Sequence, residues 1–204
     1  MSKKLNKEFR EWAIMLSVIG LLFFTGWYKD VAGFLQRGLL ETGLMRPSEL
    51  ESARPASYNF QLINEGGRTI NFSEFEGKTV FMNFWATWCT PCIAEMPDIH
   101  DLYKKIGYDV TFVMISVDIE HEKAMKFMEK KGFEFPVYFL KNEIPRTYDI
   151  HSIPTTYVIS PDGKIVIEQH GLSKYDTEKF RNFILSLAKS ESPSGNTNAS
   201  AHPE

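Results

Sequence analysis

Two adjoining stretches decide the fold of this chain: Thr79-Val80-Phe81-Met82-Asn83-Phe84-Trp85 and, three residues later, Trp88-Cys89-Thr90-Pro91-Cys92. The first is mostly apolar, aromatic or β-branched, which predicts a short buried strand. The second holds the only two cysteines among 204 residues. Two thiols separated by two residues at a strand-to-helix junction can open and close a disulfide, because the second sulfur reaches the first within one helical turn.

The positions of the two cysteines predict different roles. Pro91 suits the first turn of a helix, where its missing N–H would have no partner. We expect Cys89 at or just before this turn, where the amide dipoles favour a thiolate and lower the pKa of the thiol below that of a free cysteine. Cys92 lies one turn further in and is expected to be more buried. The predicted chemistry is attack by Cys89 on a partner's disulfide, followed by displacement of the partner by Cys92.

Two other uses of a cysteine pair compete with exchange. A purely structural bridge over so short a loop would constrain the unfolded chain little. A zinc site would need two further ligands, and there is no second cysteine pair. Four of the five histidines lie in the predicted folded domain, and the spacing between them does not match that of metal ligands: His100, His121, His151 and His170. The spacing therefore favours redox chemistry over a metal site.

Glu95 is the acidic residue nearest to the pair on the C-terminal side. It lies on one helical stripe with Ile99, Leu102 and Ile106, and this stripe is expected to face the sheet. A partly buried carboxyl three residues after Cys92 is expected to have a raised pKa and to accept or return the thiol proton. Helical periodicity is equally compatible with a side chain that reaches water.

The N-terminal region predicts a membrane anchor. Residues 12–28 carry no charged side chain. The length of this uncharged run is at the short end of the ~17–25 residues that span a bilayer. Basic residues outnumber acidic ones before this run, so the N-terminus is expected to stay in the cytoplasm. A cleaved signal peptide is the alternative, but Thr25-Gly26-Trp27 offers no Ala-x-Ala-like site.

The chain is therefore divided into five predicted parts: a cytoplasmic N-terminus over 1–11, a transmembrane anchor over 12–28, a juxtamembrane segment and linker over 29–57, a folded domain over 58–189 and a disordered tail over 190–204. The net charge is −3. An acidic domain without a basic stripe argues against a nucleic-acid partner.

Within the domain the pattern predicts an α/β fold of mixed parallel and antiparallel strands with helices on both faces of the sheet. The expected elements are a hairpin over 58–72, one helical turn over 73–76, the strand 79–85, helix 91–106, strand 110–118, helix 120–131, strand 136–140, a weak helix over 143–149, paired strands over 155–160 and 164–169, and a final helix over 176–189.

Together these motifs resemble the TlpA/ResA-like family of membrane-anchored thioredoxin-fold proteins. The resemblance rests on Phe84 to Cys92, on Glu95-Met96-Pro97 and on Ile153-Pro154-Thr155-Thr156. It implies a thioredoxin fold with an N-terminal β-hairpin extension and a central strand-helix insertion over 110–139, preceded by one transmembrane helix. Asn83 stands where ordinary thioredoxins carry a buried Asp, which fits a family whose acid lies on the helix instead.

The resemblance also implies the site. Cys89 is the nucleophile, Cys92 the resolving thiol and Glu95 the active-site acid, with a redox disulfide Cys89–Cys92. Substrate contacts are implied for Trp88, Thr90, Pro91, Ile153 and Pro154. Base rates alone predict a trans Ile153–Pro154 bond, since only ~5–6% of X-Pro bonds are cis. The resemblance implies the cis form, with Pro154 packed against the disulfide.

The family resemblance implies reduction of specific disulfides on the periplasmic side of the bacterial inner membrane, cytochrome c maturation being the best-known case. The implied partners are client protein thiols and disulfides, such as those of an apocytochrome c, and a membrane electron donor of the DsbD or CcdA type. No bound cofactor and no metal are needed. From the residues alone, the direction of exchange stays open.

Three alternatives remain. A thiol peroxidase shares the fold, but its Pro-x-x-x-Thr-x-x-Cys loop is absent, because Met82 and Ala86 occupy the Pro and Thr positions before Cys89. A copper chaperone of similar fold needs a wider cysteine spacing and a dedicated histidine, for which His151 is a weak candidate. The third alternative is a tethered binding module in which the bridge is an inert clip.

Overall fold

The computed structural model describes residues 8, 10–18, 20, 35, 38 and 46–189. Residues 10–18 are helical. Within the described residues, no helix has both the length and the apolar character needed to cross a bilayer. Much of the predicted anchor over 12–28 and all of the predicted tail over 190–204 lie outside the described residues.

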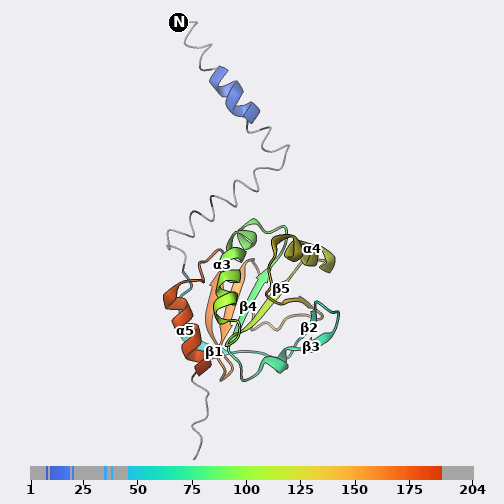
Figure 1. Cartoon of the computed structure of the whole chain (residues 1–204), viewed down its shortest axis with the longest axis vertical. Coiled ribbons are helices and arrows are strands. Elements are labelled where there is room, and N and C mark those ends of the chain that lie inside the picture. Colours follow the sequence, from blue (N-terminus) through green and yellow to red (C-terminus); the bar gives the residue numbers. More distant parts are fainter. Residues whose placement is uncertain are drawn as a thin grey trace, which may run out of the picture.

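Residues 46–189 fold around one eight-stranded sheet, whose strand order is β1-β8-β7-β4-β5-β6-β2-β3 (Figure 1). The strands are β1 Glu49–Pro55, β2 Gln61–Asn64, β3 Thr69–Asn71, β4 Val80–Trp85, β5 Thr111–Ser116, β6 Val137–Leu140, β7 Thr155–Ile159 and β8 Lys164–His170. The helices are the short 3₁₀ helix η1 Phe72–Phe75 and the α-helices α3 Thr90–Ile106, α4 His121–Lys131 and α5 Glu178–Lys189.

Strand β4 lies in the middle of this sheet and leads directly to the cysteines. It pairs in parallel with β5 and antiparallel with β7, and all six of its residues are buried. Its side chains alternate between two cores: Phe81 and Trp85 belong to one, and Met82 and Phe84 to the other. A strand buried on both faces needs apolar residues at every position, which explains the continuous run in the sequence.

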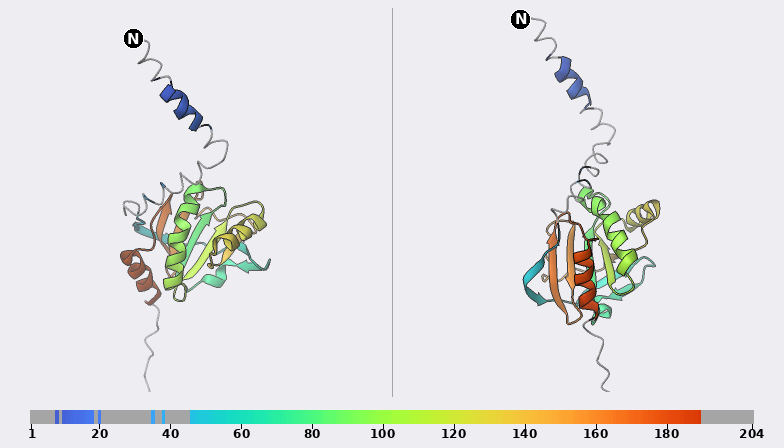
Figure 2. Two further views of the ribbon diagram at one scale, coloured as in Figure 1. Left: turned by 45° about the horizontal axis from the view of Figure 1, so that its top comes forward. Right: turned by 60° about the vertical axis from the view of Figure 1, so that its left-hand side comes forward.

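The three α-helices lie on one face of the sheet (Figure 2). Their apolar residues share one core, which includes Ile99 of α3, Met128 of α4 and Ile184 of α5. The opposite face is covered by η1 and by loops, whose aromatic side chains stack there, as Phe60 does on Phe72 with 4.3 Å between ring centroids.

Helices on both faces, predicted from the sequence, are found in the described residues only through the single 3₁₀ turn η1, because α3, α4 and α5 share one face. The stretch 143–149, predicted to be a weak helix, forms turns instead. Pro145 lacks an N–H, and the N–H of Tyr148 donates to the carbonyl of Pro145 in a tight turn. The stretch still covers the sheet, because Ile144, Tyr148 and Ile150 pack into the second core.

The predicted linker over 29–57 is also corrected, because it contains β1. This strand pairs antiparallel with β8 at the sheet edge, with a register shift between Glu49 and Arg54. Five of its seven residues are exposed, so backbone pairing rather than apolar alternation holds it in place. The folded domain therefore begins before residue 58. The hairpin formed by β2 and β3 is confirmed, and it pairs through β2 with β6.

Candidate active site

The two cysteines occupy the start of α3, directly after the loop that follows β4. Cys89 is the N-cap residue, and its sulfur accepts a hydrogen bond from the backbone N–H of Cys92 at 3.2 Å. Pro91 sits in the first turn, where a missing N–H costs nothing. The sulfurs of Cys89 and Cys92 are joined in a disulfide. Cys89 keeps 5% of its surface exposed and Cys92 none, so an incoming group meets Cys89 first.

A second segment approaches the disulfide from the start of β7. The Ile153–Pro154 peptide bond is cis, as the family resemblance implied and contrary to the base rate for X-Pro bonds. The carbonyl oxygen of Ile153 lies 3.7 Å from Sγ of Cys89. This carbonyl therefore faces the more exposed sulfur.

The predicted substrate-contact residues differ in how far they are exposed. Trp88 is the most exposed of them, with 67% of its surface open to solvent beside the disulfide. Thr90, Pro91 and Ile153 are half-buried, and Pro154 is buried. The site therefore presents one projecting aromatic side chain and a half-buried rim.

Glu95 points into the protein rather than to water. Its side chain is fully buried. Oε1 accepts a hydrogen bond from Nδ2 of Asn83 at 3.0 Å, and Oε2 accepts one from the backbone N–H of Ser173 at 3.2 Å. Burial raises the pKa of this carboxyl well above its ordinary range and the Asp98 carboxyl adds to the rise, while the hydrogen bonds from Ser173 and Asn83 oppose it. The predicted raised pKa is confirmed in direction.

A chain of buried polar groups continues behind Glu95. Nδ2 of Asn83 also lies 2.8 Å from Oγ1 of Thr156, and the hydroxyl of Tyr175 donates to the same Oγ1 at 2.7 Å. Burial, followed by the negative charge of Glu95, raises the pKa of Tyr175 well above its ordinary range, so this phenol stays a donor. The backbone N–H of Tyr175 in turn donates to the Asp98 carboxylate at 2.6 Å, which fixes this loop to α3.

Asp118 holds the loop between β4 and the disulfide, and sequence reasoning missed it. Its carboxylate accepts hydrogen bonds from the N–H of Thr87 at 2.9 Å, from the hydroxyl of Thr87 at 2.7 Å and from Ser116 at 2.9 Å. The sequence does contain a pattern that indicates Asp118. Ser116 and Asp118 stand at the carboxyl end of a buried strand parallel to β4, where functional groups of parallel sheets gather.

No group of three His, Cys, Asp or Glu side chains suited to a metal ion occurs in the part of the chain that the structure describes. His151, the candidate for a copper site, has 95% of its side chain exposed, and its Nε2 lies 3.5 Å from a carboxylate oxygen of Asp149.

The sequence over residues 54–167 matches the AhpC/TSA family. The chain belongs to this family. It is 32% identical over 160 residues to "Thiol-disulfide oxidoreductase ResA" of Bacillus cereus, an alignment that spans 78% of this chain and 88% of that protein. A protein of the same name from Bacillus subtilis is 37% identical over 110 residues, spanning 53% of this chain and 62% of the relative.

Solved structures give the same result for the fold. A thiol:disulfide interchange protein of the thioredoxin family from Chlorobium tepidum superposes with a TM-score of 0.56 at 30% identity, covering 66% of this chain and 99% of that one. The family and the mixed α/β thioredoxin-like fold of the domain predicted from the motifs are therefore confirmed. This AhpC/TSA member is a thiol-disulfide oxidoreductase of the ResA type with a Cys89–Cys92 pair.

Proposed function

We propose that this oxidoreductase reduces disulfides of client proteins on the periplasmic side of the bacterial inner membrane, tethered there by residues 12–28. The observation that carries the direction is the burial of Glu95 one helical turn after Cys92, with no charged hydrogen-bond donor to it among the described residues. The burial that raises the pKa of the Glu95 carboxyl also disfavours a negative charge on the neighbouring buried sulfur of Cys92. A thiolate form that is disfavoured makes the disulfide the preferred product, and therefore makes the dithiol a reductant.

The reaction begins from the reduced pair. The Cys89 thiolate attacks one sulfur of the client disulfide, so that a Cys89–client bond forms, the client S–S bond breaks and one client thiolate leaves. Glu95 in its ionised form then takes the proton of Cys92. The resulting Cys92 thiolate attacks the sulfur of Cys89, forms the Cys89–Cys92 bond and releases the second client sulfur, which takes a proton. The client gains two electrons, and the protein ends in the disulfide state.

A new cycle requires two electrons from another dithiol. The proposed donor is a membrane protein of the DsbD or CcdA type, which would attack the exposed Cys89 sulfur and leave as a disulfide. The proposed client is an apocytochrome c, whose haem-binding cysteines must be reduced before haem attachment. Both assignments follow from the family resemblance, and the 5% exposure of Cys89 against 0% for Cys92 agrees with attack at a single sulfur.

The test is capture of the client with Cys92→Ser. This variant retains the attacking sulfur and lacks the resolving one, so that we expect a stalled mixed disulfide in membrane extracts, released by reductant. Cys89→Ser is the matched control and should trap nothing. Failure of Cys92→Ser to trap any protein, or equal trapping by both variants, would overturn the proposal.

A further inference from the structure

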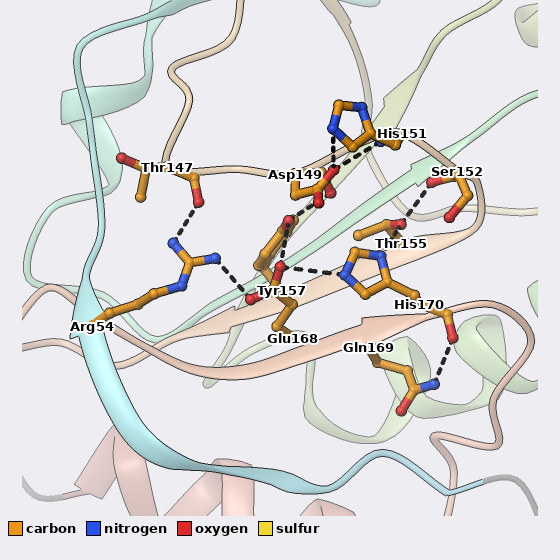
Figure 3. Close-up of polar contacts among 10 residues, drawn as sticks. All are labelled: Arg54, Thr147, Asp149, His151, Ser152, Thr155, Tyr157, Glu168, Gln169 and His170. Carbon is orange, nitrogen blue, oxygen red and sulfur yellow. Dashed lines mark hydrogen bonds and ion pairs between the residues drawn. The ribbon is translucent and has the colours of Figure 1, made fainter.

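The loop that carries the Ile153 carbonyl to the disulfide contains no regular helix or strand between β6 and β7. A segment of this kind needs other contacts to hold its backbone. Figure 3 shows a cluster of side chains from β1, β7 and β8 that reaches this loop from below, centred on the carboxylate of Glu168. No step of the sulfur chemistry uses this cluster.

Two members of the cluster bind the loop backbone directly. The guanidinium of Arg54 donates to the carbonyl of Thr147 and, through Nη2, to Oε2 of Glu168 at 2.7 Å. The hydroxyl of Tyr157 donates to the carbonyl of Asp149 at 2.7 Å and lies 3.1 Å from Oε1 of Glu168. One carboxylate thus lies against two side chains, and each of them donates to one loop carbonyl.

A third connection reaches the residue before Ile153. Nε2 of His170 lies 3.3 Å from Oε1 of Glu168, and Nδ1 of the same ring lies 3.1 Å from Oγ1 of Thr155. That hydroxyl donates to the carbonyl of Ser152 at 2.7 Å. The cluster therefore contacts the loop at three carbonyls, and the last of them is adjacent to the residue that faces Cys89.

The cluster is shielded enough for its charges to matter. Tyr157 is fully buried, and the side chains of Glu168 and Arg54 are 17% and 35% exposed. Charge-assisted hydrogen bonds of partly buried groups are stronger than neutral ones, and removing one partner leaves the other without compensation. Loss of Arg54 would therefore release the Thr147 carbonyl and leave Glu168 without its cation.

We propose that Arg54, Tyr157 and Glu168 are positioning residues that pre-order the loop 147–153 for extended protein clients. This inference rests on the proposed function. A client that lies along the Ile153 backbone needs that backbone in one conformation, and ordering it in advance saves conformational entropy on binding. A small disulfide reacts at Cys89 without needing the loop. The cluster thus separates protein substrates from small ones.

The test is Arg54→Met, assayed with insulin as a protein disulfide and with a small aromatic disulfide as a second substrate. We expect KM for insulin to rise about 5- to 10-fold with kcat unchanged, and the rate with the small disulfide to stay the same. Arg54→Lys should recover part of the affinity. Arg181→Met is the matched control, since it also removes a partly buried arginine paired with a carboxylate, on α5.

Hydrogen–deuterium exchange of residues 147–153 supplies a readout independent of turnover. Exchange in this loop should be faster in Arg54→Met and in Glu168→Gln than in the wild type, and unchanged in Arg181→Met. Unaltered exchange, or an equal loss of rate with both disulfides, would overturn the inference. Absence of insulin reduction by the wild type would count against the proposed function instead, while the exchange data would still decide the role of the cluster.

Discussion

Two glutamates, one behind the disulfide and one beneath the loop 147–153, are held in opposite ways. Glu95 is fully buried and accepts hydrogen bonds from the amide side chain of Asn83 and the backbone N–H of Ser173, neither of them charged. Glu168 lies in the cluster that contacts the loop 147–153, and it binds the guanidinium of Arg54. The guanidinium gives Glu168 a charge-assisted hydrogen bond, and the pair serves as a tether. A carboxyl without a cation keeps a raised pKa and is able to exchange its proton.

The surroundings of Glu95 are suited to both protonation states. Oδ1 of Asn83 has no hydrogen-bond partner among the described residues, whereas Nδ2 has two. Rotation of this amide by 180° would turn its oxygen toward Glu95 and Thr156, where it would accept from a protonated carboxyl and from the threonine hydroxyl. One side chain can therefore donate to the carboxylate or accept from the acid.

The largest expected effect is that of Glu95→Gln on the second step of exchange. Glutamine keeps the shape of the side chain and cannot take the Cys92 proton, so release of the client should slow by about 10²-fold at neutral pH. The wild-type rate should rise with pH as Glu95 ionises, and the variant should lose this rise. Stopped-flow measurement of mixed-disulfide resolution against pH checks both expectations.

Glu168→Gln is the control for that experiment. It changes a glutamate of the tether and should leave the pH profile of client release as in the wild type. Identical profiles for wild type and Glu95→Gln would reduce Glu95 to a packing role and remove the distinction between the two carboxyls.

The same substitution should change how stability depends on pH. Because the pKa of Glu95 is raised in the folded state, the folded protein binds more protons than the unfolded chain between the ordinary carboxyl pKa and the raised one. The free energy of unfolding therefore falls as pH rises through this window. Glu95→Gln should remove that fall, so the variant gains stability relative to wild type toward neutral pH. Urea unfolding at a series of pH values measures the free energy of unfolding of both proteins. Parallel plots of this free energy against pH for wild type and Glu95→Gln would contradict the prediction.

Sequence patterns predicted the parts of this site that depend on local spacing. The apolar run 79–85 gave the central strand, and the cysteine spacing together with Pro91 gave the cap of α3. The stripe shared with Ile99 predicted the face of Glu95 but left open whether its side chain reaches water, and the structure shows it buried. Each of these signals is contained within one element, so tertiary contacts were not needed to interpret it.

The contacts that surround these residues come from distant segments. Ser173 and Tyr175 are brought to Glu95 by the loop before α5, and Arg54 reaches Glu168 from an edge strand with an exposed, polar sequence. No periodicity within a segment encodes such pairings. The polar edge strand itself has no alternating pattern, so its sequence predicts a linker rather than a strand.

The smallest expected effect is that of Tyr175→Phe, which removes one buried hydroxyl from the chain behind Glu95. The lost hydrogen bond to Thr156 should lower the free energy of unfolding by about 1 kcal/mol. It should also weaken the hold of Thr156 on Asn83, so that the carboxylate form of Glu95 is less well stabilised and the pH profile of client release moves to higher pH.

Tyr148→Phe provides the matched control, because its hydroxyl is also buried and donates to one acceptor, the carbonyl of Ser57 at 2.9 Å, in the core on the opposite face of the sheet. Both variants should lose similar stability, and only Tyr175→Phe should move the profile. An equal shift in both would mean that the profile follows global stability. No shift in either would mean that Asn83 alone orients Glu95, and the polar chain would then end at that amide.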